Sequence, residues 1–302
     1  MLAMTELKSI PLSEFLSLEL PSRSFIIDPL LPKGGLMEIY AAAGIGKTTF
    51  ALSLGLSAAI GQSFMKWGVH KPWNVLYIDG EMADSDMQNR LDAATQSFNV
   101  PSKEISNFRL LSRDQCGGVL PDIGTVEGQN RLQPETEVAD LIFLDNLSCL
   151  MFSGKENDAD AWSVVQRWLL TLRAQEKSIV MLHHSGKNGS SRGTSRRHDA
   201  LDTVIKLDRP SAYNQSDGAK FEVQFEKTRH FFGPEAEPIG LEYCVEGGIA
   251  CWNEFEITNE KEVKVVTLTK EGMNQVEIAS HLGISQGEVS KRLKSARANG
   301  LC

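Results

Sequence analysis

The stretch AAAGIGKTTFALSLGLSAAIG, residues 41–61, decides how the rest of the chain is organised. Gly46 is followed by Lys47 and Thr48, and a strongly helix-forming run comes next. Such a loop offers backbone N–H groups, a lysine and a hydroxyl to a phosphate group and its Mg²⁺ ion. The usual pattern, G-x-x-x-x-G-K-[ST], here has Ala41 at its first position, where alanine closes the turn if its φ is negative. We therefore expect a phosphate-binding loop between a strand and a helix.

Composition and charge limit the class of protein. The chain has 302 residues, of which 41% are hydrophobic and 23% charged, as in a globular α/β domain with a small appendage. No apolar run approaches the ~18 residues that span a bilayer, and charges interrupt the N-terminus, so neither a membrane protein nor a secretion signal is expected. The net charge of −8 restricts any nucleic-acid contact to a local surface. Five cysteines without a C-x-x-C pair favour a reducing cytoplasm with incidental thiols and no metal site.

Apolar strand patterns alternate with helical patterns before several strand patterns follow one another. This order predicts an α/β fold, a mainly parallel sheet flanked by helices and extended by antiparallel strands. The stretch 113–137 has little periodicity and is expected to be a loop. The expected strands are 35–44, 74–81, 107–112, 138–148 and 177–185, then LDTVIKL, KFEVQFEKTR, IGLEYCV and IACWNEF. Helices are expected at about 84–98 and around Trp162 and Trp168, whose rings we expect in the core.

A polar stretch at 256–262 marks an expected domain boundary. We expect an ATPase-type nucleotide domain at 1–256, with its core at about 24–245, and a small all-α domain at 263–302. The tail is expected to hold two helices around a glycine turn. Its expected inward-facing residues are Val276, Ile278, Ala279 and Leu282 on the first helix, and Val289 and Leu293 on the second.

Two acidic residues at strand ends complete the expected nucleotide site. Asp145 ends the apolar run LIFLD, where its carboxylate and the Thr48 hydroxyl are expected to hold Mg²⁺. Glu81 ends VLYIDGE and is the expected group that polarises an attacking water. Asp79 is a rival, because alternation along a strand places both acids on one face. Glu81 is preferred because it lies nearer the carboxyl end of the strand, where open parallel sheets bind ligands.

These motifs together resemble the RecA-like P-loop ATPases. Within that group, LHHSGK (182–187) followed by RGTSRRHDALDTVIKL (192–207) is similar to the plasmid-type RepA hexameric helicase branch. The resemblance covers about residues 24–245 and implies ATP and Mg²⁺ as cofactors. It also implies that His184, with His183 beside it, senses the γ-phosphate. The residues expected to bind the nucleotide are Ala43, Gly44, Ile45, Gly46, Lys47, Thr48, Thr49 and Asp145.

The stretch FEKTRHFFGPEAEPIGLEY (225–243) resembles the late strand of the wider DnaB-like group. That resemblance implies that Lys227 and Arg229 act as fingers in the ATP site of a neighbouring subunit, within a homo-oligomer that is a hexameric ring. A strand places both side chains on one face. Without the resemblance, a solvated strand edge explains the pair equally well.

Two basic stretches are candidates for DNA contact. Residues 185–197 are rich in glycine and serine and contain no acid, which suits contacts with single-stranded DNA that change with nucleotide state. The tail pattern Q-x-E-I-A-x-x-L-G-I-S-x-x-x-V-S resembles a helix-turn-helix, which binds duplex DNA or serves as an assembly module. The candidates are Lys187, Arg192, Arg196 and Arg197 in the first stretch, and Gln286, Ser290, Lys291, Arg292, Lys294 and Arg297 in the tail.

The sequence therefore predicts a cytoplasmic ATP-driven DNA helicase or translocase that acts on single-stranded DNA. The resemblance places it in the replication of a plasmid or other mobile element. An ATP-dependent DNA-binding regulator or loader that does not unwind DNA is the alternative. A recombinase-like filament former is a third option, which the HHSGK and K-x-R resemblances disfavour.

Overall fold

A computed structural model of the chain describes residues 9–20, 22–153, 159–186, 196–210, 213–257 and 260–298. The strands are β1 (Phe25–Ile27), β2 (Leu31–Pro32), β3 (Leu36–Ala41), β4 (Val75–Asp79), β5 (Phe108–Ser112), β6 (Leu141–Asp145), β7 (Ser178–His184), β8 (Thr203–Asp208), β9 (Ala219–Thr228), β10 (Ile239–Glu246) and β11 (Ile249–Phe255). The helices are α1 (Leu12–Leu16), α2 (Lys47–Ile60), α3 (Asp84–Ser97), α4 (Val126–Val138), α5 (Leu147–Leu150), α6 (Ala159–Ala174), α7 (Arg196–Asp199), α8 (Glu260–Lys270), α9 (Gln275–Leu282) and α10 (Gln286–Ala298).

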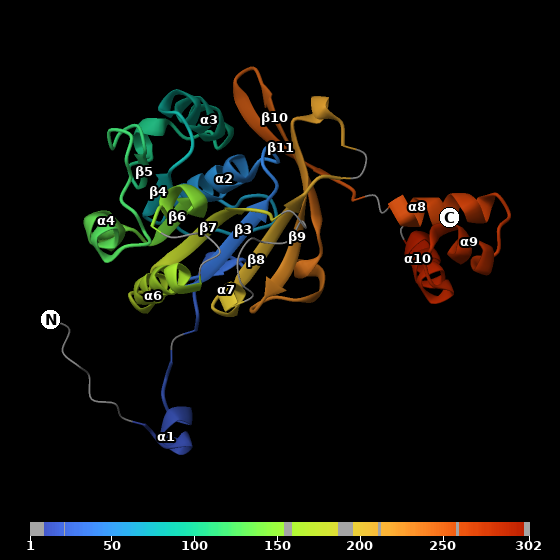
Figure 1. Ribbon diagram of the computed structural model, residues 1–302, viewed down its shortest axis with the longest axis horizontal. Helices are drawn as coiled ribbons and strands as arrows, with labels where there is room; N and C mark the ends of the chain where they lie inside the picture. Colours follow the sequence, from blue (N-terminus) through green and yellow to red (C-terminus); the bar gives the residue numbers. More distant parts are fainter. Residues whose placement is uncertain are drawn as a thin grey trace.

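One mixed sheet organises the structure (Figure 1). In the described part of the chain it has nine strands, in the order β11-β10-β9-β8-β3-β7-β6-β4-β5. The strands from β8 to β5 pair in parallel, and β9, β10 and β11 extend the sheet in antiparallel pairs. The prediction of a mainly parallel α/β sheet with added antiparallel strands is confirmed. The carboxyl ends of β3, β4, β6 and β7 meet at one edge, as parallel pairing requires.

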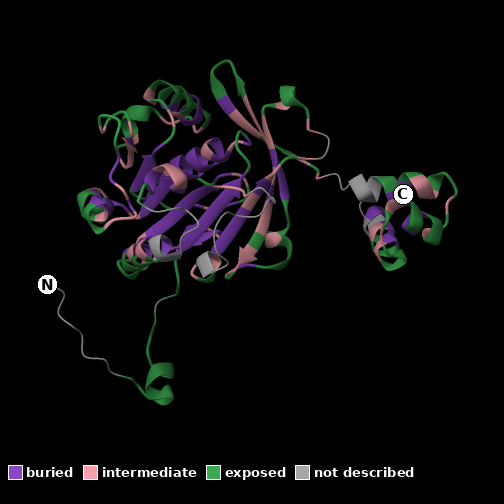
Figure 2. Cartoon of the chain, in the orientation of Figure 1, coloured by how far each residue is buried: buried purple, intermediate pink, exposed green. Residues whose placement is uncertain are grey.

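The central strands are buried on both faces, which explains their nearly continuous apolar sequences (Figure 2). On β3, Met37 and Ile39 join the core that includes α2, whereas Leu36 and Tyr40 join the opposite core. The second core is closed by side chains from α4, α5 and α6. Trp162 of α6 is buried there and Trp168 packs against it, so both tryptophans belong to the core as predicted.

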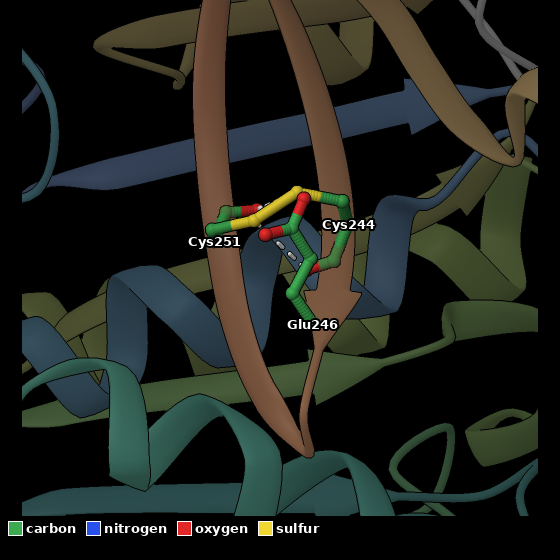
Figure 3. A group of neighbouring side chains, drawn as sticks. All are labelled: Cys244, Glu246 and Cys251. Carbon is green, nitrogen blue, oxygen red and sulfur yellow. Dashed lines mark hydrogen bonds between the residues drawn. A yellow bond between two sulfur atoms is a disulfide. The ribbon is translucent and has the colours of Figure 1, made fainter.

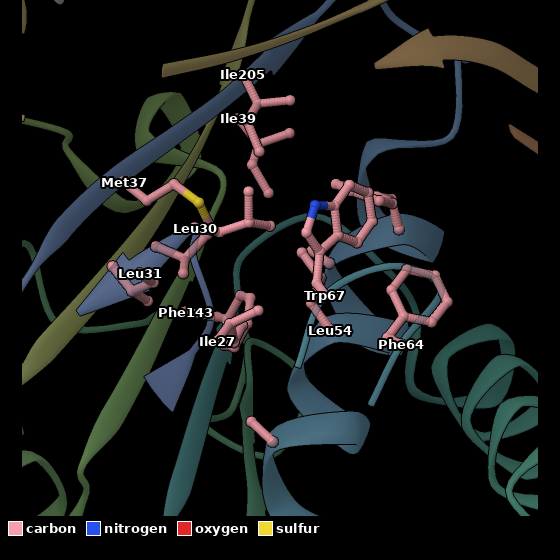
Figure 4. Close-up of a cluster of buried hydrophobic side chains, with 14 of the residues drawn as sticks. Ile27, Leu30, Leu31, Met37, Ile39, Leu54, Phe64, Trp67, Phe143 and Ile205 are labelled. Carbon is pink, nitrogen blue, oxygen red and sulfur yellow. The ribbon is translucent and has the colours of Figure 1, made fainter. Parts of the chain in front are cut away.

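The core on the α2 side has an aromatic centre (Figure 4). Trp67 is 1% exposed, and its ring meets Phe50 edge-on at 5.5 Å and Phe64 at 5.9 Å between centroids. Trp252 of β11 reaches the same cluster and donates from Nε1 to Ser53 Oγ of α2 at 3.0 Å. The terminal antiparallel strands are thereby tied to the helix that follows the phosphate loop.

The prediction of a loop at 113–137 is wrong, because helix α4 occupies the second half of this stretch. Thr125 caps this helix by accepting a hydrogen bond from Gly128 N at 3.0 Å. Pro134 lies inside the helix, and Leu132 is its fully buried large apolar residue. So few apolar contacts leave little helical periodicity in the sequence, which is why the pattern was not recognised.

The tail contains three helices rather than the two that were expected, since α8 packs against α9 and α10. Val289 and Leu293 are buried as predicted, together with Ile278, but Val276 is 61% exposed, so its inward orientation was wrong. The polar break is also shorter than expected, because α8 begins within the stretch 256–262. In Figure 1 these three helices stand apart from the sheet. The division into two domains stays a prediction.

Two cysteines expected to be incidental thiols form a disulfide, Cys244–Cys251 (Figure 3). They face each other across the hairpin of β10 and β11, whose register sequence spacing alone does not reveal. Glu246 lies beside them, but sulfurs bonded to each other are not thiolate ligands for a metal. Cys116 and Cys149 are free, and Cys302 lies outside the described residues. Among the described helices, none is long and apolar enough to cross a membrane.

We predict that Trp67→Ala lowers the free energy of unfolding by about 3–5 kcal/mol, because it leaves a large cavity among packed rings. Urea denaturation followed by circular dichroism measures the change. Phe232→Ala is the control, since this aromatic side chain is 85% exposed and its loss is expected to have little effect. Equal effects of the two substitutions would contradict the assignment of Trp67 to the centre of the core.

Candidate nucleotide site

The loop between β3 and α2 has the backbone that a phosphate-binding loop needs. Its positive φ angles fall on Gly44 (74°) and Gly46 (123°) and not on Ala41, so alanine fits the first position of the motif. A Cβ atom on Gly46 would lie 3.0 Å from the Phe221 ring and 3.1 Å from the Ala219 methyl carbon. Gly46 is therefore required by both its φ angle and its neighbours.

Lys47 points back across this loop. Its Nζ lies 3.3 Å from the carbonyl oxygens of Ala41 and Ala42, and 3.2 Å from Nδ1 of His184. Burial lowers the pKa of Lys47, and the charges of Asp145 and Glu81 oppose that shift. A buried ammonium with carbonyl acceptors at the N-terminus of a helix suits a phosphate oxygen, because phosphate supplies the negative charge that the carbonyls lack.

Thr48, Asp145 and Tyr77 form the second part of the site. Asp145 Oδ2 accepts hydrogen bonds from Thr48 Oγ1 at 2.8 Å and from the Tyr77 hydroxyl at 2.7 Å. Asp145 is 1% exposed, and burial raises its pKa despite these two donors. A hydroxyl and a carboxylate in contact are the oxygen ligands that Mg²⁺ prefers, so the residues present fit this ion. Tyr77 was missed because its role depends on how β4 and β6 pair.

A chain of polar side chains links Lys47 to Glu81. Asn146 donates from Nδ2 to Glu81 Oε2, and the same Nδ2 lies 3.2 Å from His184 Nε2. An ammonium only donates, so Nδ1 of His184 accepts from Lys47 and a neutral ring carries its proton on Nε2. That atom faces Glu81 Oε2 at 3.7 Å. His183 is fully buried on the adjacent strand position, so His184 is the histidine of this site.

Glu81 and Asp79 both line the same pocket, but strand alternation is not what places them there. Strand β4 ends at Asp79, so strand alternation does not extend to Glu81. Asp79 is 1% exposed, its Oδ2 accepts from Met82 N at 2.9 Å, and burial raises its pKa to about 7. The Glu81 side chain is 55% exposed and opens toward the pocket. A water molecule therefore has readier access to Glu81.

A pocket of about 790 Å³ surrounds these residues. Arg90 of α3 lies in its wall and donates from Nη1 to Thr49 Oγ1 at 3.0 Å. Tyr243 and Val245 of β10 line another part of the wall, and burial raises the pKa of Tyr243. Sequence reasoning missed all three, because they come from elements whose place beside the loop only the fold reveals. The residues of the predicted set that line the pocket are Ala43, Gly44, Gly46, Lys47, Thr48, Thr49, Glu81, Asp145 and His184.

Lys227 and Arg229 are not part of the pocket lining. Both donate hydrogen bonds to carbonyl oxygens of α7, Lys227 to that of His198 and Arg229 to that of Asp199. They therefore point to the same side, as strand geometry predicted. Their role as fingers in a neighbouring site stays a prediction.

None of the predicted DNA contacts whose side chains the structure describes lines the nucleotide pocket. Lys187 and Arg192 lie outside the described residues, and Arg196 and Arg197 begin α7, although their side chains also lie outside the description. On α10, Arg292 is half-buried and donates to Glu288 Oε1 at 2.6 Å, and the Arg297 side chain lies outside the description. The exposed candidates of α10 are Gln286, Ser290, Lys291 and Lys294.

Comparison with known proteins agrees with this geometry. Residues 4–190 match the sequence profile of a family described as an AAA domain. The chain belongs to this family. A solved ATPase domain is similar in structure, with a TM-score of 0.50 and 16% identity over 74% of this chain and 86% of that chain. At this identity the likeness concerns the fold alone, and together with the sheet order above it shows that the chain has a RecA-like α/β fold.

The flagellar accessory protein FlaH from Methanocaldococcus jannaschii is also similar in structure. Its TM-score is 0.48 at 12% identity, over 74% of this chain and 90% of that chain. A search of curated proteins gives no match to the sequence.

Within this AAA domain, we predict that Tyr77→Phe lowers the free energy of unfolding by about 1–2 kcal/mol, because buried Asp145 loses a donor. Urea denaturation measures the change. Tyr213→Phe removes an exposed hydroxyl that donates to Gly218 O at 3.1 Å and is the matched control. The account of Asp145 is contradicted if Tyr77→Phe is as stable as the wild type.

Proposed function

We propose that the chain is an ATPase that uses Mg²⁺-ATP to move on single-stranded DNA as a helicase or translocase. The observation that carries the proposal is the set of contacts around His184, whose Nδ1 accepts from Lys47 and whose Nε2 faces Glu81 Oε2 at 3.7 Å, while Asn146 donates to that same oxygen. The AAA-domain family supports nucleotide binding. One of the structural relatives is itself an ATPase domain, which points in the same direction.

The side chains divide the work of hydrolysis as follows. Lys47 binds phosphate oxygens, and Thr48 with Asp145 holds Mg²⁺, which neutralises charge on the phosphates when bound. Glu81 orients and polarises the attacking water, because it is an exposed carboxylate of the pocket just beyond β4. His184 accepts from Lys47 at Nδ1 and faces Glu81 with Nε2, so a change in the phosphate bound at Lys47 reaches Glu81 through this ring. This contact is how we propose that His184 senses the γ-phosphate.

The base and sugar are proposed to lie against Arg90 and Tyr243. Both side chains line the pocket, and both have flat faces suited to stacking on a purine. Val245 adds an apolar surface beside them.

We predict that Glu81→Gln keeps ATP affinity within about threefold and lowers turnover by roughly a hundredfold or more, because an amide cannot take up a proton. Nucleotide binding by calorimetry and phosphate release measure the two quantities. Asp86→Asn is the matched control, since it removes an exposed carboxylate from the same pocket without touching Asn146. If Glu81→Gln retains near-normal turnover, Asp79 or another group is the base.

The proposal includes self-association into a ring, with six subunits as the expected number. Helix α1 buries none of its residues, and Leu12 and Leu16 on it are 72% and 73% exposed. Such an apolar helix is suited to covering by a second copy of the chain. Lys227 and Arg229 lie outside the pocket of their own subunit, which suits cations that act on a neighbour's nucleotide.

We predict that Arg229→Ala protein binds ATP but does not hydrolyse it, because the missing charge belongs to the neighbouring site. Mixing it with Lys47→Ala protein places some intact loops beside intact fingers, so part of the activity returns. Phosphate release across a series of mixing ratios measures this recovery.

Arg167→Ala is the control for that series, since Arg167 is an exposed arginine of α6 outside the pocket. A mixture that exchanges subunits without regaining activity would contradict the action of Arg229 across a subunit boundary.

A second function is favoured by the exposed polar and basic residues of α10. Lys291 and Lys294 on that helix suit duplex DNA, as in a regulator or loader that uses ATP to control assembly without unwinding. Strand displacement on a forked DNA substrate separates the two functions. Displacement that depends on ATP supports the helicase, and its absence together with duplex binding supports the regulator.

A further inference from the structure

Helix α7 is held against the sheet by a buried carboxylate. His198 Nε2 lies 3.6 Å from Glu38 Oε1, and Glu38 is 0% exposed on the central strand β3. Neither residue lines the nucleotide pocket. The proposed chemistry of that pocket therefore does not account for Glu38.

A carboxylate at this place is costly unless it is paired, because burial removes its hydration. The neighbouring inward positions on the same face of β3 are Leu36 and Tyr40, and both pack into the core. Tyr40 in turn donates to Glu226 of β9. The partner that Glu38 has in α7 is the imidazole of His198.

The same helix is held from a second side. Lys227 donates to the carbonyl of His198, and Arg229 donates to the carbonyl of Asp199. Cations at carbonyl groups that end a helix are favourable, so the pair stabilises α7 in this position. Asp202, just beyond α7, accepts from Leu36 N at 3.0 Å, which ties the chain to β3 directly. The Glu38–His198 contact is thus a side-chain link between α7 and the middle of the sheet.

We propose that Glu38 is a positioning residue whose carboxylate binds protonated His198 and so fixes α7 for contact with a single-stranded DNA backbone. Helix α7 contains Arg196 and Arg197, two of the residues predicted to contact DNA. The choice of single-stranded DNA as the ligand rests on the proposed function. The contact between Glu38 and α7 can be tested without DNA.

Because the contact requires a protonated His198, its strength depends on pH. The pKa of His198 is raised above its ordinary value of 6.5, first by the hydrogen bond with Glu38, with help from the charges of Glu38 and Glu226. Burial and the charge of Lys227 oppose the shift, and Asp199 and Arg229 are the other charged groups at this end of α7. A raised pKa means that the contact is fully present below 6.5 and is lost as the pH rises through the raised pKa.

The test measures affinity for a fluorescent oligothymidine at constant salt, from about pH 6 to about pH 9, across the range in which histidine titrates. Wild-type affinity is expected to fall as the pH rises. In Glu38→Gln the midpoint of this fall shifts to lower pH, and affinity near neutral pH drops by about tenfold or more, as for the loss of one hydrogen bond to a charged group. His198→Gln, at a half-exposed position where the change is compatible with folding, is expected to abolish the pH dependence.

Glu222→Gln is the matched control, because it removes a carboxylate from β9 whose Oε2 accepts from Gln224 rather than from α7. Its affinity and pH profile are expected to equal those of the wild type. ATP affinity is expected to be unchanged in all three variants, since none of these residues lines the pocket.

Hydrogen exchange of α7 in the absence of DNA distinguishes failure of the anchor from failure of the proposed function. Faster exchange of α7 in Glu38→Gln and His198→Gln, but not in Glu222→Gln, supports the anchor. Unchanged exchange and an unchanged pH profile in the first two variants would overturn it. A wild-type protein that does not bind the oligonucleotide at any pH would reject the DNA role of α7 and the proposed function together.

Discussion

Asp145 is the buried carboxylate on which the nucleotide site depends. It ends β6, accepts from Thr48 at the start of α2, and accepts from Tyr77 on β4. A buried acid needs such donors, so the three elements must keep this arrangement. The phosphate loop is thereby held at the carboxyl edge of the sheet. Its two required glycines, Gly44 and Gly46, then give the backbone its turn into the helix.

The other polar groups of the nucleotide site lie along the same edge of the sheet. His184 at the end of β7 touches Lys47, and Asn146 directly after Asp145 lies between His184 and Glu81. Parallel strands with adjacent carboxyl ends make these contacts possible, because each strand supplies one group to the same edge. Helix α7 is held by other groups, namely the contact of Glu38 on β3 with His198 and the hydrogen bonds of Lys227 and Arg229 to its carbonyl oxygens.

Much of the fold and the strand-end residues could be predicted because buried parallel strands have distinct apolar sequences. Asp145 was found in this way at the end of such a run, whereas the loop was found from its glycine-lysine-threonine pattern and His184 from the resemblance to a known helicase branch. Exposure was less predictable: Asp79 at the end of β4 is buried, whereas the Glu81 side chain, two residues beyond it, is exposed. Contacts that depend on pairing register, such as Tyr77 with Asp145 or Cys244 with Cys251, leave no local pattern in the sequence. Helices α4 and α8 were not predicted, because few apolar residues at helical spacing mark them in the sequence.

The most direct test of the account is ATP turnover by the purified chain, measured as phosphate release with and without Mg²⁺ and with and without single-stranded DNA. Lys47→Ala protein prepared in the same way gives the background from contaminating enzymes. The account predicts turnover that requires Mg²⁺, rises with single-stranded DNA and is absent from Lys47→Ala. Turnover equal in the two proteins, or none in the wild type under all conditions, would contradict it.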